Sequence, residues 1–156
     1  MLTKVKNTKA ARVSGFRFAI IASRYNGEYV DAMVRAAEKT LAEAGGRTET
    51  IRVPGAYEIP VVAARLARRK SSRCAAIICL GVILRGETTH AQHIGEAVSN
   101  AFAQIQVETG VPVIHEVLLL ENRQQAEVRC LDPEHNRGVE AAQTALEMAR
   151  VMASLR

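Results

Sequence analysis

Aromatic residues are scarce in this sequence of 156 residues. It has no tryptophan, three tyrosines and three phenylalanines, which argues against a surface that binds single-stranded nucleic acid by stacking bases on aromatic rings. A block of positive charge is also lacking, because the basic residues behind the net charge of +5 are spread along the chain. We therefore expect the surface to attract small anionic metabolites rather than nucleic acid.

Long apolar segments and paired cysteines are absent as well. The longest apolar run, residues 75–84, is too short to span a bilayer, and no apolar segment of a secretory signal follows the basic first residues. The cysteines, Cys74, Cys79 and Cys130, form no Cys-x-x-Cys pair, and their odd number suits a reducing compartment. These absences predict a cytoplasmic protein without a membrane segment.

The pattern that is present alternates between strands and helices. Apolar, β-branched runs predict core strands at residues 16–23, 48–53, 75–84 and 111–120. Helical spacing predicts helices from Asn26, as N-cap, to about residue 44, from Pro60 to about Lys70, from His90 to Gly110, from Asn122 to about Arg129, and from Gly138 onward. This order predicts an α/β, flavodoxin-like three-layer sandwich, in which helices cover both faces of a four-stranded parallel core sheet.

The length predicts a single domain of residues 1–156. Residues 1–14 are mostly polar and basic. We expect them to form either a flexible arm or an edge strand on a neighbouring subunit.

Polar residues cluster directly after each predicted strand. They occupy residues 23–26, 54–58 and 85–90, and the segment after Leu120. In a parallel α/β sheet, ligands bind beyond the carboxyl ends of the strands. The 85–90 cluster also opens a helix, and helix N-termini bind anions. The sequence thus predicts one site at this edge, with an anion subsite at residues 85–90.

Four segments in this order resemble those of 6,7-dimethyl-8-ribityllumazine synthases. They are Ser-Arg-Tyr-Asn at 23–26, Val-Pro-Gly-Ala-Tyr-Glu-Ile-Pro at 53–60, Arg-Gly-Glu-Thr-Thr-His at 85–90 and Asn-Arg-Gly-Val-Glu-Ala-Ala at 136–142. The resemblance implies a transferase of riboflavin biosynthesis that condenses 5-amino-6-(D-ribitylamino)uracil with 3,4-dihydroxy-2-butanone 4-phosphate, releasing phosphate and water. It implies no metal and no organic cofactor. It also implies a homopentamer, with a 60-subunit icosahedral shell left open, and an association with riboflavin synthase.

The resemblance assigns roles to individual residues. Tyr25 would stack on the pyrimidine ring, and His90 would carry protons near neutral pH. His115 and Arg129 would come from the adjacent subunit, beside the ring and at the phosphate respectively, and Arg137 would add positive charge at that interface. The remaining contacts would be Ala56, Tyr57 and Glu58 with the ribityl chain, the backbone of Val82, Ile83 and Leu84 with the heterocycle, and Gly86, Glu87 and Thr88 with the phosphate through N–H groups.

Simpler interpretations exist for several of these residues. Tyr25 could plug the edge of the core, and Glu58 could merely complement the dipole of the following helix. His90 and His93 are i, i+3 neighbours and could share a metal ion, but no further ligand stands at a suitable spacing. A non-catalytic, shell-forming relative that binds flavin or lumazine is the alternative function. Such a relative would lose His90 and the phosphate arginine, and both are present.

Three departures from the family pattern bear on the site. Ala91-Gln92 follow His90 where relatives commonly have an aromatic residue and an acid. His115 stands where many have phenylalanine. Residues 131–135 replace a loop rich in glycine and lysine that is associated with icosahedral assemblies.

Overall fold

The computed structural model describes residues 3–5 and 13–155. Its sheet has four parallel strands in the order β2-β1-β3-β4. The strands are β1 (Arg17–Ser23), β2 (Arg47–Val53), β3 (Ala76–Leu84) and β4 (Val113–Leu120). The predicted α/β flavodoxin-like fold is confirmed, and each strand lies within two residues of its predicted bounds.

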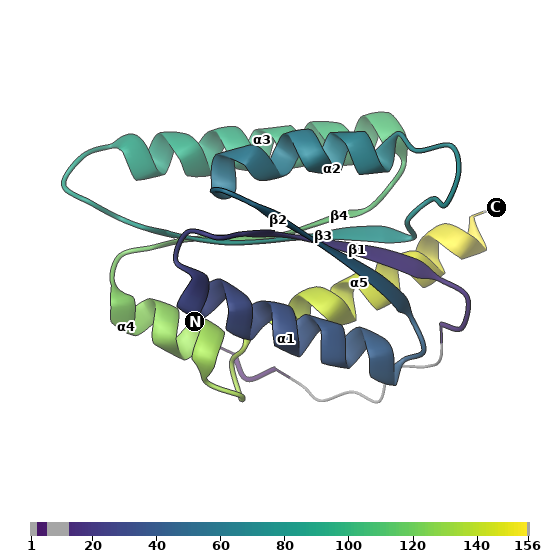
Figure 1. Cartoon of the computed structure of the whole chain (residues 1–156), viewed down its shortest axis with the longest axis horizontal. Coiled ribbons are helices and arrows are strands. Elements are labelled where there is room, and N and C mark those ends of the chain that lie inside the picture. The colour runs from purple at the N-terminus through teal and green to yellow at the C-terminus, as the bar shows by residue number, and fades with distance from the viewer. Residues whose placement is uncertain (1–2, 6–12, 156) are drawn as a thin grey trace.

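Helices cover both faces of this sheet (Figure 1). One face carries α2 (Ile59–Ala67) and α3 (His90–Thr109), and the other carries α1 (Gly27–Glu43), α4 (Arg123–Ala126) and α5 (Arg137–Ser154). Among the described residues there are also a 3-10 turn, η1 (Ala56–Glu58), and a π-helical turn, η2 (Glu127–Leu131). The predicted helix from Asn122 to Arg129 is therefore split into α4 and η2.

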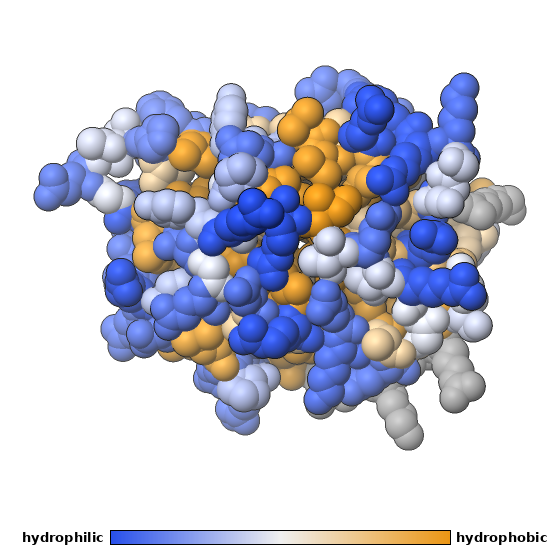
Figure 2. All heavy atoms as spheres, in the orientation of Figure 1, coloured by the Kyte–Doolittle hydropathy of each residue, from blue (hydrophilic) through white to orange (hydrophobic). Residues whose placement is uncertain are grey.

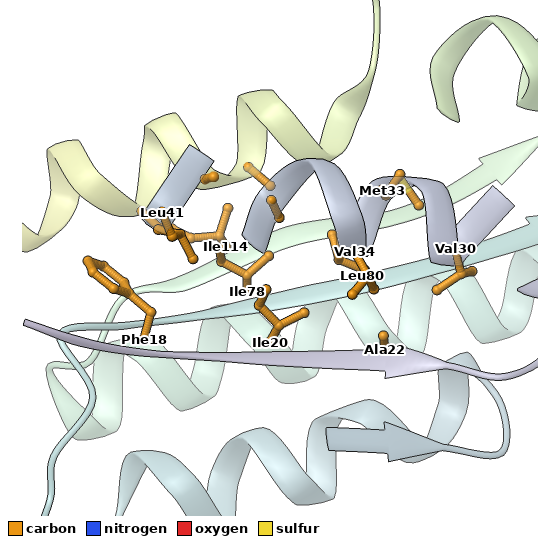
Figure 3. Close-up of a cluster of buried hydrophobic side chains, with 14 of the residues drawn as sticks. Phe18, Ile20, Ala22, Val30, Met33, Val34, Leu41, Ile78, Leu80 and Ile114 are labelled. Atoms are coloured by element: carbon orange, nitrogen blue, oxygen red, sulfur yellow. The ribbon is translucent and has the colours of Figure 1, made fainter. Parts of the chain in front are cut away.

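Each face of the sheet has its own apolar core. Along β1, Phe18 and Ile20 point toward α1 and pack with Met33 and Leu41 (Figure 3). The alternate residues of the strand, Ala19 and Ile21, point to the opposite face and pack in the layer of α2 and α3. This alternation follows from the two-residue period of a strand. It explains why the central strands read as continuous apolar runs, since both of their faces are buried.

The two helices α1 and α5 approach each other closely at Gly138. A Cβ atom at this position would lie 2.7 Å from the backbone Cα and C atoms of Met33, and closer still to its carbonyl oxygen. Glycine is therefore required here by space. The adjacent Asn136 fixes the start of α5, because its side-chain oxygen accepts a hydrogen bond from the Gly138 N–H at 2.8 Å.

Two local predictions need correction. The helix predicted to reach about Lys70 ends at Ala67, with Arg68 as its C-cap. Beyond it, Arg68 and Arg69 form ion pairs with Glu108 at 3.0 Å and Glu49 at 2.8 Å. Asn26 does occupy the N-cap position of α1, but it has left-handed backbone angles and its side chain makes no capping hydrogen bond.

The predicted arm falls largely on residues 1–2 and 6–12, which lie outside the described residues. Within the described part, Val5 donates a backbone hydrogen bond to the Glu134 carbonyl at 2.8 Å, and Lys4 pairs with the Glu134 carboxylate at 2.8 Å. The described helices include none that is both long and apolar enough to cross a membrane. The face shown in Figure 2 is mostly hydrophilic, with hydrophobic residues exposed mainly over the layer of α2 and α3.

Candidate active site

The carboxyl ends of the strands surround a pocket of about 1020 Å³. Strand register brings the loops together, because Ser23 pairs with Val53 and Leu84 pairs with Leu120. The pocket is lined by Tyr25, Asn26, Gly55, Ala56, Tyr57, Glu58, Val82, Ile83, Leu84, Gly86, Thr88, His90, Ala91, His93, Ile94, Ala97 and Arg123. Segments following all four strands thus meet at one place, as the fold predicts.

Two aromatic rings stand open at this pocket. Tyr25 is 74% exposed and Tyr57 is 63% exposed, so the alternative interpretation of Tyr25 as a plug of the core edge is wrong. The Tyr25 N–H donates to the Pro54 carbonyl at 3.1 Å, which joins the loop after β1 to the loop after β2. An exposed ring on a fixed backbone can stack on a flat ligand.

Glu58 has a structural contact of its own. Its carboxylate oxygen Oε2 accepts a hydrogen bond from the Gly55 N–H at 2.9 Å, which closes the turn η1. A carboxylate has several acceptor positions, so this bond leaves capacity for a ligand hydroxyl. The carboxylate therefore serves the turn and still lines the pocket.

The end of β3 forms a further part of the lining. Val82 is buried, and its carbonyl oxygen accepts a hydrogen bond from the Asn26 side-chain amide at 2.7 Å. Asn26 thereby joins the start of α1 to β3 across 56 residues of sequence. The sequence suggested only a helix cap for this residue, and no local pattern could show a contact at such separation.

The segment between β3 and α3 carries the predicted anion site. Gly86 and Thr88 line the pocket, whereas the Glu87 side chain is not among the described lining residues. The hydrogen bonds of the described residues leave the N–H groups of residues 86–88 without a protein acceptor. Three N–H groups in sequence, with no carboxylate among them in the lining, suit an oxyanion.

His90 is the first residue of α3, as predicted, and it lines the pocket together with His93. Its N–H lies 3.4 Å from the Thr88 hydroxyl, which ties the helix start to the anion segment. Both rings belong to exposed residues. Across the described part of the chain, no group of three His, Cys, Asp or Glu side chains is arranged to hold a metal ion.

The structure does not bring three of the predicted residues into this pocket. His115, Arg129 and Arg137 line a second pocket of about 720 Å³ along the edge strand β4. The two linings have no described residue in common. Within one chain, the predicted site is therefore divided into two parts.

Hydrogen bonds determine the orientation and tautomer of His115. Its Nδ1 accepts from the Val117 N–H at 3.2 Å, so Nε2 carries the proton and donates to the Ser99 hydroxyl at 2.7 Å. Ser99 in turn donates to the Gly95 carbonyl at 2.7 Å. The ring meets Phe102 edge-on, with centroids 5.1 Å apart. Partial burial lowers the pKa of His115, which favours this neutral form.

Arg137 is held by two carboxylates of its own chain. Its guanidinium donates to both oxygens of the buried Glu116, at 3.0 and 3.1 Å, and to Glu140 at 2.6 Å. Burial raises the pKa of Glu116. Burial opposes the charge of Arg137 too, yet the bonds to Glu116 and the two nearby carboxylates raise its pKa. Much of its charge is thus neutralised, whereas the one bond of the Arg129 side chain to another described residue is to the Gln125 carbonyl, at 3.4 Å.

Sequence comparisons add independent information. The sequence model of the 6,7-dimethyl-8-ribityllumazine synthase family matches residues 15–153. A protein of that name from Xanthomonas oryzae pv. oryzae (strain PXO99A) is 42% identical over 139 residues, covering 87% of this chain and 89% of the relative. One from Xylella fastidiosa (strain 9a5c) is 40% identical over 147 residues, with coverage of 92% and 94%. Another, from Stenotrophomonas maltophilia (strain R551-3), is 41% identical over 142 residues, with coverage of 89% and 90%. The chain therefore belongs to the 6,7-dimethyl-8-ribityllumazine synthase family, the transferases that form lumazine in riboflavin biosynthesis.

Proposed function

We propose that the 1020 Å³ pocket is the site where this enzyme condenses 5-amino-6-(D-ribitylamino)uracil with 3,4-dihydroxy-2-butanone 4-phosphate. One observation carries the proposal: the segments after all four strands meet around an exposed aromatic ring, a carboxylate, free N–H groups and an imidazole. The volume lies at the upper end of the range for small-molecule pockets, about 300–1,000 Å³. It can therefore accept two substrates side by side.

In this proposal, each substrate meets matching groups. The pyrimidine ring stacks on Tyr25 and lies over the backbone of residues 82–84, and the ribityl hydroxyls bind at residues 56–58. The phosphate binds the N–H groups of residues 86–88. Holding the amine beside the ketone supplies a large part of the rate, because a reaction between two molecules becomes effectively intramolecular.

His90 is the proposed proton carrier. Imine formation, release of phosphate and ring closure each require a proton to move near neutral pH, and imidazole titrates in that range. The position of His90 supports this role, because it directly follows the segment proposed to hold the phosphate and its side chain faces the same pocket.

We further propose that the second pocket of one subunit faces the first pocket of its neighbour. His115 and Arg129 would then reach the ring and the phosphate of the adjacent site, with Arg137 at the same interface. The proposed assembly is a homopentamer, and whether pentamers build a 60-subunit shell is left open. Exposed apolar side chains on α2 and α3, Val61 at 70% and Val107 at 83%, suit helices that contact other subunits. We also propose that the chain forms a single domain, acts in the cytoplasm and associates with riboflavin synthase.

The activity is tested by mixing purified protein with both substrates and a metal chelator, and following lumazine fluorescence. Lumazine is expected to form faster than in the protein-free control. A folded protein that gives only the control rate would refute the proposal.

The shared site is tested by subunit exchange. We expect Arg129→Ala and the double variant Tyr25→Ala, His90→Ala each to be weakly active. After dissociation and reassembly together, mixed rings contain some sites with both halves intact, and activity should exceed the sum of the two. If mass spectrometry shows mixed rings without such recovery, Arg129 does not act in the neighbouring site.

A further inference from the structure

The turn after β4 is held beside the turn after β3. The Arg85 N–H donates to the Leu120 carbonyl at 2.8 Å, and the Arg85 side chain pairs with Glu121 at 3.4 Å. These bonds extend the pairing of Leu84 with Leu120 by one residue. The residues that follow Leu120 are therefore neighbours of the proposed phosphate segment.

Side-chain hydrogen bonds hold the residues that follow Leu120, 121–125, in place. The Asn122 side chain accepts from the Gln125 N–H at 2.9 Å, and the Gln125 side chain accepts from the Glu121 N–H at 3.0 Å. Arg123, which begins α4 between them, consequently has a defined backbone position. Arg123 lines the first pocket together with Gly86, Thr88 and His90.

Arg123 brings a charge that the rest of this pocket lacks. Among the described lining residues it is the sole lysine or arginine. No carboxylate of the described residues lies within ion-pair distance of it, in contrast to the paired Arg85. Arg129, only six residues further on, lines the other pocket. One segment thus presents two arginines to two different pockets.

We infer that Arg123 is a phosphate-binding residue of its own subunit's site, beside the N–H groups of residues 86–88. This inference rests on the proposed function, because it takes the phosphate ester to be the substrate. The N–H groups supply directed hydrogen bonds but no net charge, whereas a phosphate monoester carries nearly two negative charges. A guanidinium can donate two parallel hydrogen bonds to such a group. A single subunit then holds a cation for the phosphate before its neighbour contributes Arg129.

The test compares Arg123→Ala, Arg123→Lys and a control, Arg35→Ala, in the full assembled protein. Arg35 is an exposed arginine of α1 that lines neither pocket. Calorimetric titration with inorganic phosphate measures anion binding directly, and steady-state assays measure KM for each substrate. Losing a charge-assisted contact at this exposed position should weaken phosphate binding about tenfold. We expect KM for the butanone phosphate to rise similarly in Arg123→Ala, KM for the pyrimidine to change less than twofold, and Arg123→Lys to recover part of both losses.

The outcomes separate this inference from the proposed function. Unchanged phosphate affinity in folded Arg123→Ala, equal losses for both substrates, or an equal effect of Arg35→Ala would each overturn the role of Arg123. So would a wild-type protein that binds no phosphate. If Arg123→Ala does not fold, the wild type is compared instead with Arg123→Lys and Arg123→Gln. We then expect phosphate affinity to fall from wild type to Arg123→Lys and further to Arg123→Gln, and equal affinities would overturn the role of Arg123. Weakened phosphate binding in Arg123→Ala together with no lumazine formation by the wild type would support the anion site and refute the proposed reaction.

Discussion

Replacing Gly138 with alanine should destabilise the protein, because the new methyl group would enter the backbone of α1. It would meet the Cα and C atoms of Met33 at 2.7 Å and the carbonyl oxygen more closely. Neither helix can yield locally, since α1 and α5 both pack on the same core. Overpacking of this kind costs about 3 kcal/mol, and the gain from replacing a helical glycine offsets about 1 kcal/mol. The net loss is about 2 kcal/mol, or about 4–8 °C in Tm for a domain of this size.

The matched control is Gly95→Ala in α3. A Cβ atom there would lie 3.6 Å from the nearest Leu119 methyl carbon, an ordinary van der Waals distance. Relief of the glycine penalty should stabilise this variant by about 0.5–1 kcal/mol. Differential scanning calorimetry of both variants at equal subunit concentration measures the opposite shifts. A Gly138→Ala protein as stable as the wild type would refute the steric argument.

Three further predictions concern side chains around the two pockets. His90→Ala should lower turnover about tenfold or more, whereas His93→Ala, from the same pocket, should change it little in the fluorescence assay; equal effects would argue against a special role for His90. Glu116→Gln should lower the free energy of unfolding measured in urea by about 1–2 kcal/mol, because Arg137 loses the charge of its buried partner but remains partly exposed. An unchanged unfolding midpoint would show that this charge contributes nothing to stability. Because burial lowers the pKa of His115 below its ordinary 6.5, the unfolded chain takes up its proton first as pH falls. The contribution of His115 to the free energy of unfolding is therefore fully present above the ordinary pKa and is lost as the pH falls below it. In His115→Phe, the free energy of unfolding should consequently fall less between about pH 7 and pH 5 than in the wild type. Parallel pH profiles for the two proteins would contradict this assignment.

The sequence predicted the fold well because the signals are local and strong. Residues 75–84 are apolar on both faces, and this pattern suits a central parallel strand. The polar segments directly follow the strands, so the topology alone places them at one edge. The ends of helices were less certain. The helix predicted to about Lys70 ends at Ala67, and the two arginines after it pair with carboxylates on α3 and β2, which no local pattern records.

What the sequence could not show depends on contacts between distant segments. The bond from Asn26 to the Val82 carbonyl joins residues 56 positions apart. The tautomer of His115 follows from Ser99 on α3 and from the Val117 N–H. The position of Arg123 in the first pocket follows from the pairing of two turns. In each case the partner is supplied by packing, which local periodicity does not record.

The segment formed by α4 and η2 borders both pockets: Arg123 lines the first, and Gln125 and Arg129 line the second. Its final turn is π-helical, closed by a hydrogen bond from the Asp132 N–H to the Glu127 carbonyl at 3.2 Å. A ligand that shifts this segment on filling one pocket would alter the shape of the other. Such coupling is reciprocal, so each ligand would change the affinity of the other by the same factor. If subunits share their sites as proposed, this segment would connect binding at one site with binding at the next.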